Sequence, residues 1–244
     1  MNRWGVVTGL RAEARIAETA FGRGWVVCAG PGPAHARRAA LALVERGAAG
    51  LVSFGIAGGL DPSLRPGTLI LAGTVIGPGG EIWSCDADGV RELTHRVGAL
   101  ANPPAFVTGV RIAGSDSAVV SVADKRVMVE AVTAAAVDME SHAVAAMAEE
   151  RGLPLLVIRA VADPAGRSLP PLALAGIAGD GSTRPWAVVA KLLLAPQHLP
   201  ALLRLASDSS AGFAALSALA AGWHDHRTPG TAHLPGHPPG HPPG

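Results

Sequence analysis

Two acidic residues that could do chemistry lie within one stretch of the chain, from Val137 to Asp163. Glu140 lies where a helix is predicted to begin, and Asp163 ends the strand that follows this helix. Ligands of open α/β sheets bind at the carboxyl ends of the strands, so both carboxylates could face one crevice. A carboxylic acid can donate a proton, and a carboxylate can stabilise developing positive charge. The stretch therefore offers two acidic groups to one pocket.

The elements that must position these groups have clear signals in the sequence. Apolar residues recur at helical spacing between Asp138 and Gly152, and Gly152 followed by Pro154 predicts the end of this helix. Leu155 to Val161 is a run of mostly leucine and β-branched residues. Such a run is typical of a strand that is buried on both faces of a parallel sheet.

The rest of the chain alternates predicted strands and helices, which indicates an α/β fold. Further strands are predicted at Trp4–Thr8, Trp25–Ala29, Gly50–Phe54, Thr68–Ile76 and Ala105–Ile112, with turns at Gly55–Gly59 and Gly114–Ser117 and a loop around Trp83. Further helices are predicted at about Leu10–Ala20 and from after Pro33 through Val44. Others are predicted at about Val90–Leu100, Ser121–Ala135, Pro185–Leu194 and Gln197–Leu219.

The composition sets limits on the class of protein. A chain of 244 residues with 49% hydrophobic and 16% charged residues can bury a large sheet under helices. The net charge of +1 argues against a nucleic-acid partner, which needs a clustered basic face. Cys28 and Cys85 lie far apart without metal spacing, which favours a reduced cytosolic compartment. The N-terminus does not resemble a signal peptide, and no apolar run reaches the roughly 18 residues of a spanning helix. We expect a protein that is not integral to a membrane.

Residues 1–222 are predicted to form one catalytic domain, and residues 223–244 a disordered tail rich in Pro, Gly and His. The tail histidines His233, His237 and His241 are four residues apart. They have no rigid frame, so a solvated tail is favoured over a metal site.

Three segments together resemble the purine and uridine phosphorylase superfamily, and within it the 5′-methylthioadenosine/S-adenosylhomocysteine nucleosidases. They are Gly9–Glu13, Phe54–Gly67, and Asp138-Met139-Glu140 with the strand that ends at Asp163. Asp163–Pro171, with the Leu-rich helices after it, resembles a narrower group, the hopanoid-associated phosphorylases. The resemblance covers about residues 3 to 220. It implies a three-layer αβα fold with a central mixed, mostly parallel twisted sheet, and at least a homodimer.

The resemblance also implies roles for single residues. Cleavage of a purine N-glycosidic bond needs a proton at N7 and stabilisation of a cationic ribosyl transition state. Asp163 matches the acid that protonates N7, Glu140 the carboxylate that binds the ribose hydroxyls, and Glu13 the glutamate that holds the attacking water. Met139 would lie against the sugar. In the remaining substrate-binding positions we place Asp138 and Val119, where Val119 stands near the position of a stacking aromatic residue in the nucleosidases.

Each of these residues also has a simpler interpretation. Asp163 precedes a proline and could form a turn, and Glu13 and Glu140 could stabilise helix N-termini. Met139 could fill the core. We favour the functional interpretation because the residues occur together.

The sequence leaves the nucleophile open. A phosphorolytic enzyme needs an anion site of backbone N–H groups and arginines, for which Arg11, Gly58 and Gly59 are the candidates. However, Ser53 and Ile56 stand where the resemblance implies an arginine and a serine that bind phosphate. No glycine turn fits a dinucleotide site, so we predict no cofactor and no metal, with inorganic phosphate as co-substrate only if the reaction is phosphorolysis.

The resemblance implies an enzyme that releases adenine from an adenosine with a bulky apolar 5′ group. The leading hypothesis is phosphorolysis of adenosylhopane to adenine and a phosphoribosyl hopanoid, and the alternative is hydrolysis by a nucleosidase. A non-catalytic nucleoside-binding module is a hypothesis of another class. The expected partner is a small-molecule nucleoside, lipid-linked in the leading hypothesis, and the expected location is the cytoplasm with transient contact with a membrane surface. The apolar stripe of Leu199, Leu202, Leu203 and Ala206 could guide a lipid or simply pack on the sheet.

Overall fold

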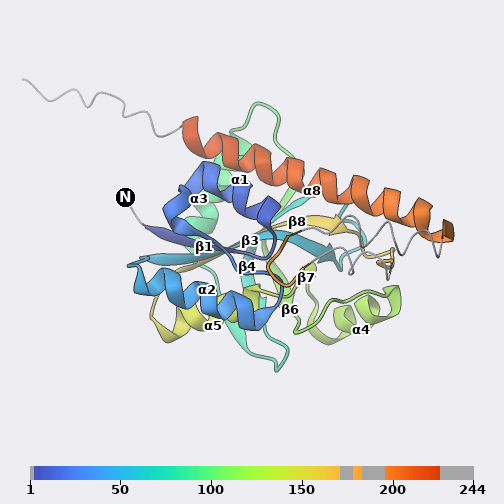
Figure 1. Ribbon diagram of the computed structural model, residues 1–244, viewed down its shortest axis with the longest axis horizontal. Coiled ribbons are helices and arrows are strands. Elements are labelled where there is room, and N and C mark those ends of the chain that lie inside the picture. The colour runs from blue at the N-terminus through green and yellow to red at the C-terminus, as the bar shows by residue number, and fades with distance from the viewer. Residues whose placement is uncertain (1–2, 171–177, 183–195, 226–244) are drawn as a thin grey trace, which may run out of the picture.

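The computed structural model describes residues 3–170, 178–182 and 196–225. Within these ranges, one mixed sheet lies between helices on both faces (Figure 1). The strands are β1 (Trp4–Thr8), β2 (Val26–Cys28), β3 (Gly50–Gly59), β4 (Leu69–Ile76), β5 (Ile82–Ser84), β6 (Phe106–Gly114), β7 (Ala136–Asp138) and β8 (Leu155–Asp163). The helices are α1 (Arg11–Phe21), α2 (Pro33–Glu45), α3 (Ala87–Gly98), α4 (Val122–Val132), α5 (Ser141–Glu150) and α8 (Leu199–Asp225), with short 3₁₀ turns at Arg23–Trp25 and Pro196–His198.

The sheet is mostly parallel, as the sequence predicts. Its order is β2-β1-β3-β7-β6-β4-β5, and β8 pairs with both β3 and β4. The antiparallel pairs are β3 with β7, β4 with β5 and β4 with β8, while the other pairs are parallel. Strands β3, β8, β4, β6 and β7 therefore close a ring in which each strand pairs with the next. All nine residues of β8 are buried, as predicted for a strand covered on both faces.

The predicted turn at Gly55–Gly59 is wrong, because these residues continue β3. Their backbone pairs with β8, with a register shift after Ala57, and Gly58 and Gly59 also pair with β7. Glycine at position 55 is required by packing instead of by a turn. A Cβ atom there would lie 2.5 Å from Oε1 of Glu13 and 2.7 Å from Arg159. Gly55 thus lets two buried charged groups approach the strand.

Other boundaries also differ from the prediction. The helix expected at Ser121–Ala135 ends at Val132, where Thr133 takes a left-handed conformation with φ of 47°. Residues Ala136–Asp138 then form β7, and the next helix begins at Ser141 instead of Asp138. The loop expected around Trp83 contains β5. In each case, pairing with a neighbouring strand supplies the backbone hydrogen bonds and overrides the local pattern.

Helix α8 runs along one face of the molecule and packs on α1, α3 and β8 (Figure 1). The sequence predicted this helix at Gln197–Leu219, and it extends to Asp225, past the predicted start of the tail at residue 223. The helix predicted at Pro185–Leu194 and residues 226–244 lie outside the described residues. Among the residues that the structure describes, no helix is both long and apolar enough to cross a membrane.

The contrast between the two ends of α8 gives a stability prediction. Leu216 is fully buried, whereas Leu203 on the same helix is 62% exposed. We expect Leu216→Ala to lower the free energy of unfolding by about 2–5 kcal/mol, because it leaves a cavity. Leu203→Ala is the control and should change it by no more than about 0.5 kcal/mol. Urea denaturation measures both, and equal losses would contradict this packing of α8.

Candidate active site

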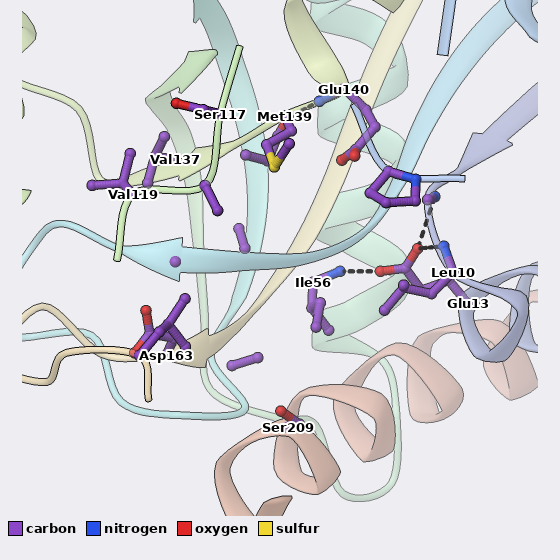
Figure 2. Close-up of a pocket in the computed structure, with 18 of the residues that line it drawn as sticks. Leu10, Glu13, Ile56, Ser117, Val119, Val137, Met139, Glu140, Asp163 and Ser209 are labelled. Atoms are coloured by element: carbon purple, nitrogen blue, oxygen red, sulfur yellow. Dashed lines mark hydrogen bonds between the residues drawn. The ribbon is translucent and has the colours of Figure 1, made fainter. Parts of the chain in front are cut away.

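A cavity of about 250 Å³ opens where β3, β7 and β8 end, beside the loop before α4 and beside α8 (Figure 2). Its walls are largely apolar, with acidic groups at separate positions. The described residues that line it are Gly9, Leu10, Glu13, Pro31, Ile56, Ala57, Gly58, Ser117, Ala118, Val119, Val137, Asp138, Met139, Glu140, Ala162, Asp163, Leu169, Leu205 and Ser209. No lysine or arginine is among them.

Asp163 is the last residue of β8 and is buried at one side of the cavity (Figure 2). Its Oδ2 atom accepts a hydrogen bond of 2.6 Å from Nζ of Lys125, which lies on α4. Burial raises the pKa of Asp163, and the neighbouring Lys125 opposes this rise. The group is therefore a buried carboxyl at the carboxyl end of a parallel strand, where the sequence predicted an acid.

Glu140 lies at the N-cap of α5, on another side of the cavity. Oε1 of Glu140 accepts a hydrogen bond of 3.0 Å from the N–H of Gly32, and Oε2 lies 3.6 Å from Nη2 of Arg159. Burial raises the pKa of Glu140, Arg159 opposes this rise, and the nearby Asp138 adds to it. The side chain does not cap its own helix. Glu140 therefore borders the cavity without capping α5.

Asp138 supplies the cap that Glu140 does not. Its Oδ1 atom accepts hydrogen bonds from the backbone N–H groups of Glu140 (2.8 Å) and Ser141 (2.7 Å). Its Oδ2 atom accepts one from the Ser141 hydroxyl and lies 2.9 Å from Nε of Arg159. Asp138 borders the cavity, but its oxygens are occupied by the protein, so it holds the start of α5 in place.

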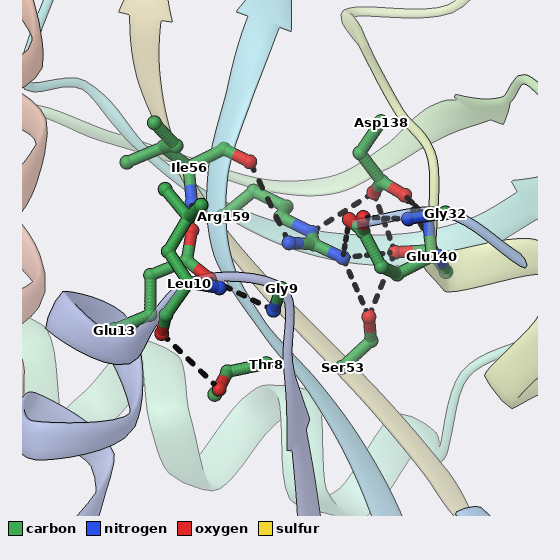
Figure 3. A network of polar contacts seen from close by, with 11 residues as sticks. Thr8, Gly9, Leu10, Glu13, Gly32, Ser53, Ile56, Asp138, Glu140 and Arg159 are labelled. Carbon is green, nitrogen blue, oxygen red and sulfur yellow. Dashed lines mark hydrogen bonds and ion pairs between the residues drawn. The ribbon is translucent and has the colours of Figure 1, made fainter. Parts of the chain in front are cut away.

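Arg159 is the buried cation that joins these carboxylates (Figure 3). It projects from the middle of β8, is 1% exposed, and its Nη2 atom donates to the hydroxyls of Ser53 (2.6 Å) and Ser141 (3.1 Å). Sequence reasoning did not single out this residue. The signal was present, because a lone charged residue inside an apolar strand must find a partner for its charge.

Glu13 lies in the first turn of α1 and is buried beside Ile56 (Figures 2 and 3). Its Oε2 atom accepts hydrogen bonds from the N–H groups of Gly9 (3.0 Å) and Leu10 (2.8 Å), and its Oε1 atom accepts one from Ile56 (2.9 Å). Burial raises the pKa of Glu13 from 4.5 to about 7, although Arg159 and the hydrogen bonds oppose this rise. Glu13 therefore stabilises its helix start and also borders the cavity.

The structure brings most of the predicted site residues together. Met139 and Val119 line the cavity with Gly58. Gly59 is not among the lining residues, and Arg11 points elsewhere, with Nη2 at 2.6 Å from Oδ2 of Asp180. Sequence reasoning also missed Lys125, for which no local pattern gave a signal.

The mixed αβα fold, with Asp138 and Asp163 at the carboxyl ends of β7 and β8, agrees with the fold that the resemblance implied. The family model described as the phosphorylase superfamily matches residues 11–184, which include Glu13, Asp138, Glu140 and Asp163. The chain belongs to the phosphorylase superfamily, which confirms the predicted superfamily and the prediction of an enzyme. The narrower likeness to the hopanoid-associated phosphorylases stays a prediction.

Solved structures with similar folds extend the comparison. The 5′-methylthioadenosine/S-adenosylhomocysteine nucleosidase of Neisseria meningitidis, in complex with methylthio-immucillin-A, superposes with a TM-score of 0.66 at 18% identity, covering 91% of this chain and 98% of that one. The corresponding nucleosidase of Colwellia psychrerythraea, in complex with adenine, gives 0.65 at 18% identity, covering 90% and 94%. Futalosine hydrolase of Helicobacter pylori gives 0.61 at 16% identity, covering 88% and 96%. At these identities the likeness concerns the fold. No curated protein sequence matches the chain.

The raised pKa of Glu13 predicts how stability depends on pH. Because this pKa is about 7 in the folded protein and 4.5 ordinarily, the folded state binds more protons between these values. The contribution of Glu13 to the free energy of unfolding is therefore full below its ordinary pKa and is lost as the pH rises towards 7. We expect Glu13→Gln to reduce the fall in stability between about pH 5 and pH 7.

Urea denaturation at the two pH values measures this difference. Glu150→Gln is the control, because Glu150 is solvent-exposed, is paired with Arg37 and has a lowered pKa. It should leave the fall in stability between the two pH values unchanged. A fall of the same size in Glu13→Gln as in the unsubstituted chain would assign the raised pKa to another group.

Proposed function

We propose that this chain cleaves the N-glycosidic bond of an adenine nucleoside with a large apolar 5′ group, and that water is its nucleophile. The observation that carries this proposal is the arrangement of three carboxyl groups around one largely apolar cavity. Asp163 lies at one side, and Glu13 and Glu140 lie at others (Figure 2). The bound molecules in two similar structures, a methylthio-immucillin and adenine, agree with a nucleoside of this kind.

Asp163 is the group suited to protonate the leaving base. All its hydrogen bonds to described side chains are made through Oδ2, which leaves Oδ1 for a ligand. Its raised pKa favours the protonated form that a general acid needs. When the bond between C1′ of the ribose and N9 of adenine breaks, its electron pair moves to the base and Asp163 supplies the proton to N7.

Glu140 is the group suited to hold the ribose. A carboxylate can accept hydrogen bonds from both the 2′- and the 3′-hydroxyl, and its negative charge becomes more favourable as the sugar ring becomes cationic. Arg159 and the N–H of Gly32 fix the carboxylate in place. Met139 borders the same part of the cavity (Figure 2) and offers the sugar an apolar surface.

The surroundings of Glu13 favour water over phosphate as the nucleophile. Near Arg159, the backbone N–H groups of Gly9 and Leu10 donate to one oxygen of the Glu13 carboxylate and that of Ile56 to the other. Several N–H groups directed at one place can bind an anion. The carboxylate of Glu13 already fills this anion site. A free phosphate would have to displace it, whereas a water molecule can be held and deprotonated by it. This favours hydrolysis.

The second candidate is phosphorolysis of adenosylhopane. Its support is the resemblance of Asp163–Pro171 to the hopanoid-associated phosphorylases. Arg11, one of the predicted phosphate ligands, would have to leave Asp180 to reach the cavity, and the described lining residues offer an incoming phosphate no side-chain cation. Phosphorolysis therefore stays a prediction, and it makes a different product from hydrolysis.

The apolar walls support an apolar 5′ substituent. Leu10, Ile56 and Leu205 line the cavity, and the helix that carries Leu205 also exposes Leu199 and Leu203. A substrate with a lipid at its 5′ carbon would extend along such a surface. The homodimer and the cytoplasmic location, with transient contact with a membrane, stay predictions.

One assay tests the reaction and the substrate. The purified chain is given adenosine, methylthioadenosine and a long-chain 5′-alkyl adenosine at matched concentrations, with and without inorganic phosphate. We expect free adenine and free ribose sugar in the absence of phosphate, and the highest kcat/KM for the long-chain substrate. A strict phosphate requirement would establish phosphorolysis. The highest kcat/KM for adenosine would refute the apolar 5′ substituent. If no substrate releases adenine, the remaining hypothesis is a non-catalytic nucleoside-binding module.

The acid is tested by Asp163→Asn, because the amide keeps the shape but has no acidic proton for N7. We expect adenine release to fall by about 100-fold to 10,000-fold, the usual contribution of a general acid, with nucleoside binding largely retained. Single-turnover kinetics and equilibrium binding measure the two effects separately. Turnover close to that of the unsubstituted chain would remove Asp163 from this role.

A further inference from the structure

A buried lysine lies directly behind the proposed acid. The chain has two lysines, and Lys125 on α4 is one of them. It is 1% exposed, although its neighbours Asp124 and Arg126 on the same helix are exposed. Burying an ammonium group is costly unless it is paired and hydrogen-bonded, so the contacts of Lys125 indicate what it does.

The ammonium group of Lys125 is surrounded by oxygen atoms from one segment. Nζ lies 2.6 Å from Oδ2 of Asp163, 3.0 Å from the carbonyl oxygens of Pro164 and Arg167, and 3.4 Å from that of Asp163. An ammonium group has three hydrogens, so all of them are used here. The carboxylate oxygen is the closest of the four acceptors.

We propose that Lys125 is a positioning residue for the proposed reaction: it fixes Oδ2 of Asp163 so that Oδ1 meets N7 of the base, and it stabilises the carboxylate that remains after the proton has left. This inference rests on the proposed function. The proton moves from Oδ1 to N7 as the base takes the electron pair of the broken bond. A buried negative charge then remains on Asp163, and the ammonium group 2.6 Å away compensates it.

The other charged groups that face Asp163 do not replace Lys125. They are Arg167, on the loop after β8, and Asp208, on α8. Arg167 and Asp208 form an ion pair with each other, so their charges largely cancel at Asp163. Lys125 is the cation in direct contact, and the ammonium lowers the pKa of Asp163 while burial raises it.

A purely structural role has to be separated from this one, because Lys125 also ties the loop at Pro164–Arg167 to α4. The two roles differ in their dependence on the leaving group. A nitrophenyl riboside needs no proton on its leaving group, whereas adenine does. Loss of a positioning residue for the acid therefore harms adenine release selectively, whereas a displaced loop harms both substrates.

The experiment compares Lys125→Met and Lys125→Gln with the matched control Arg126→Met, which removes an exposed cation from the same helix. With the 5′-alkyl adenosine, we expect kcat to fall at least about 100-fold in both Lys125 variants, as for loss of acid catalysis. With the nitrophenyl riboside, we expect a change of no more than about threefold. The control should retain both activities.

The pH profile gives a second readout with a defined sign. Adenine release needs protonated Asp163, so the rate falls as the pH rises through its pKa. In Lys125→Gln the ammonium group no longer opposes the effect of burial, so the pKa of Asp163 rises further. The alkaline limb of the pH profile should therefore move to higher pH. Equal losses on the two substrates, or an unmoved alkaline limb, would overturn the proposal.

A measurement on the folded, unsubstituted site covers the case in which the Lys125 variants do not fold. Protein labelled with carbon-13 at the lysine side chains gives two sets of signals, which Lys191→Arg assigns. Binding of 9-deazaadenine, whose N7 carries a fixed proton, should shift the Lys125 signal, and ribose should not. No shift at saturation would refute the coupling of Lys125 to the base. This readout does not depend on turnover. Failure of the proposed function is seen separately, as no release of adenine by the unsubstituted chain.

Discussion

The structure depends on the neutralisation of buried carboxylates by one buried cation. Arg159, in the middle of β8, lies beside Asp138 and Glu140 and close to Glu13, and it is almost completely inaccessible to solvent. An unpaired charge in such a place would be strongly destabilising, and loss of one partner of a buried pair typically costs about 3–5 kcal/mol. The cavity can therefore hold Glu13, Asp138 and Glu140 close together because β8 places a guanidinium group between them. Gly55 is part of the same arrangement, because a side chain at this position would collide with Glu13 and Arg159.

This arrangement separates the acidic groups by environment. Asp138 is saturated by the N-terminus of α5 and by Arg159, so it acts as part of the scaffold. Glu13 and Glu140 have raised pKa values because burial outweighs the effect of Arg159, and Asp163 has Lys125 as its own cation. Carboxyl groups with different surroundings can carry different roles in one reaction. In the proposed reaction, carboxyl groups thus serve as part of the scaffold, as the sugar ligand, as the holder of the nucleophile and as the acid.

Local patterns in the sequence predicted the fold class and the strand that carries Asp163. The buried strand that ends at Asp163 and the helix before it follow from hydrophobic periodicity and from Gly152 and Pro154. The resemblance to the family supplied Glu13 and Glu140. Strand β7 and the extension of β3 to Gly59 depend on pairing with strands distant in the chain, which no local pattern contains. Lys125 could not be found for the same reason, since its partners lie 38 to 42 residues away.

The position of β8 has a consequence for the synthesis of the protein. Strands β3 and β4 follow each other in the chain, yet β8 lies between them and pairs with both. Until residues up to 163 have been synthesised, β3 and β4 each have an open edge, because β8, the strand that pairs with both, is missing. Such edges are prone to aggregation, and long-range pairing of this kind is slow. The ring of strands closes only when β8 enters it, and that step brings Arg159 to its carboxylates. The cavity and the hydrophobic core are therefore completed together.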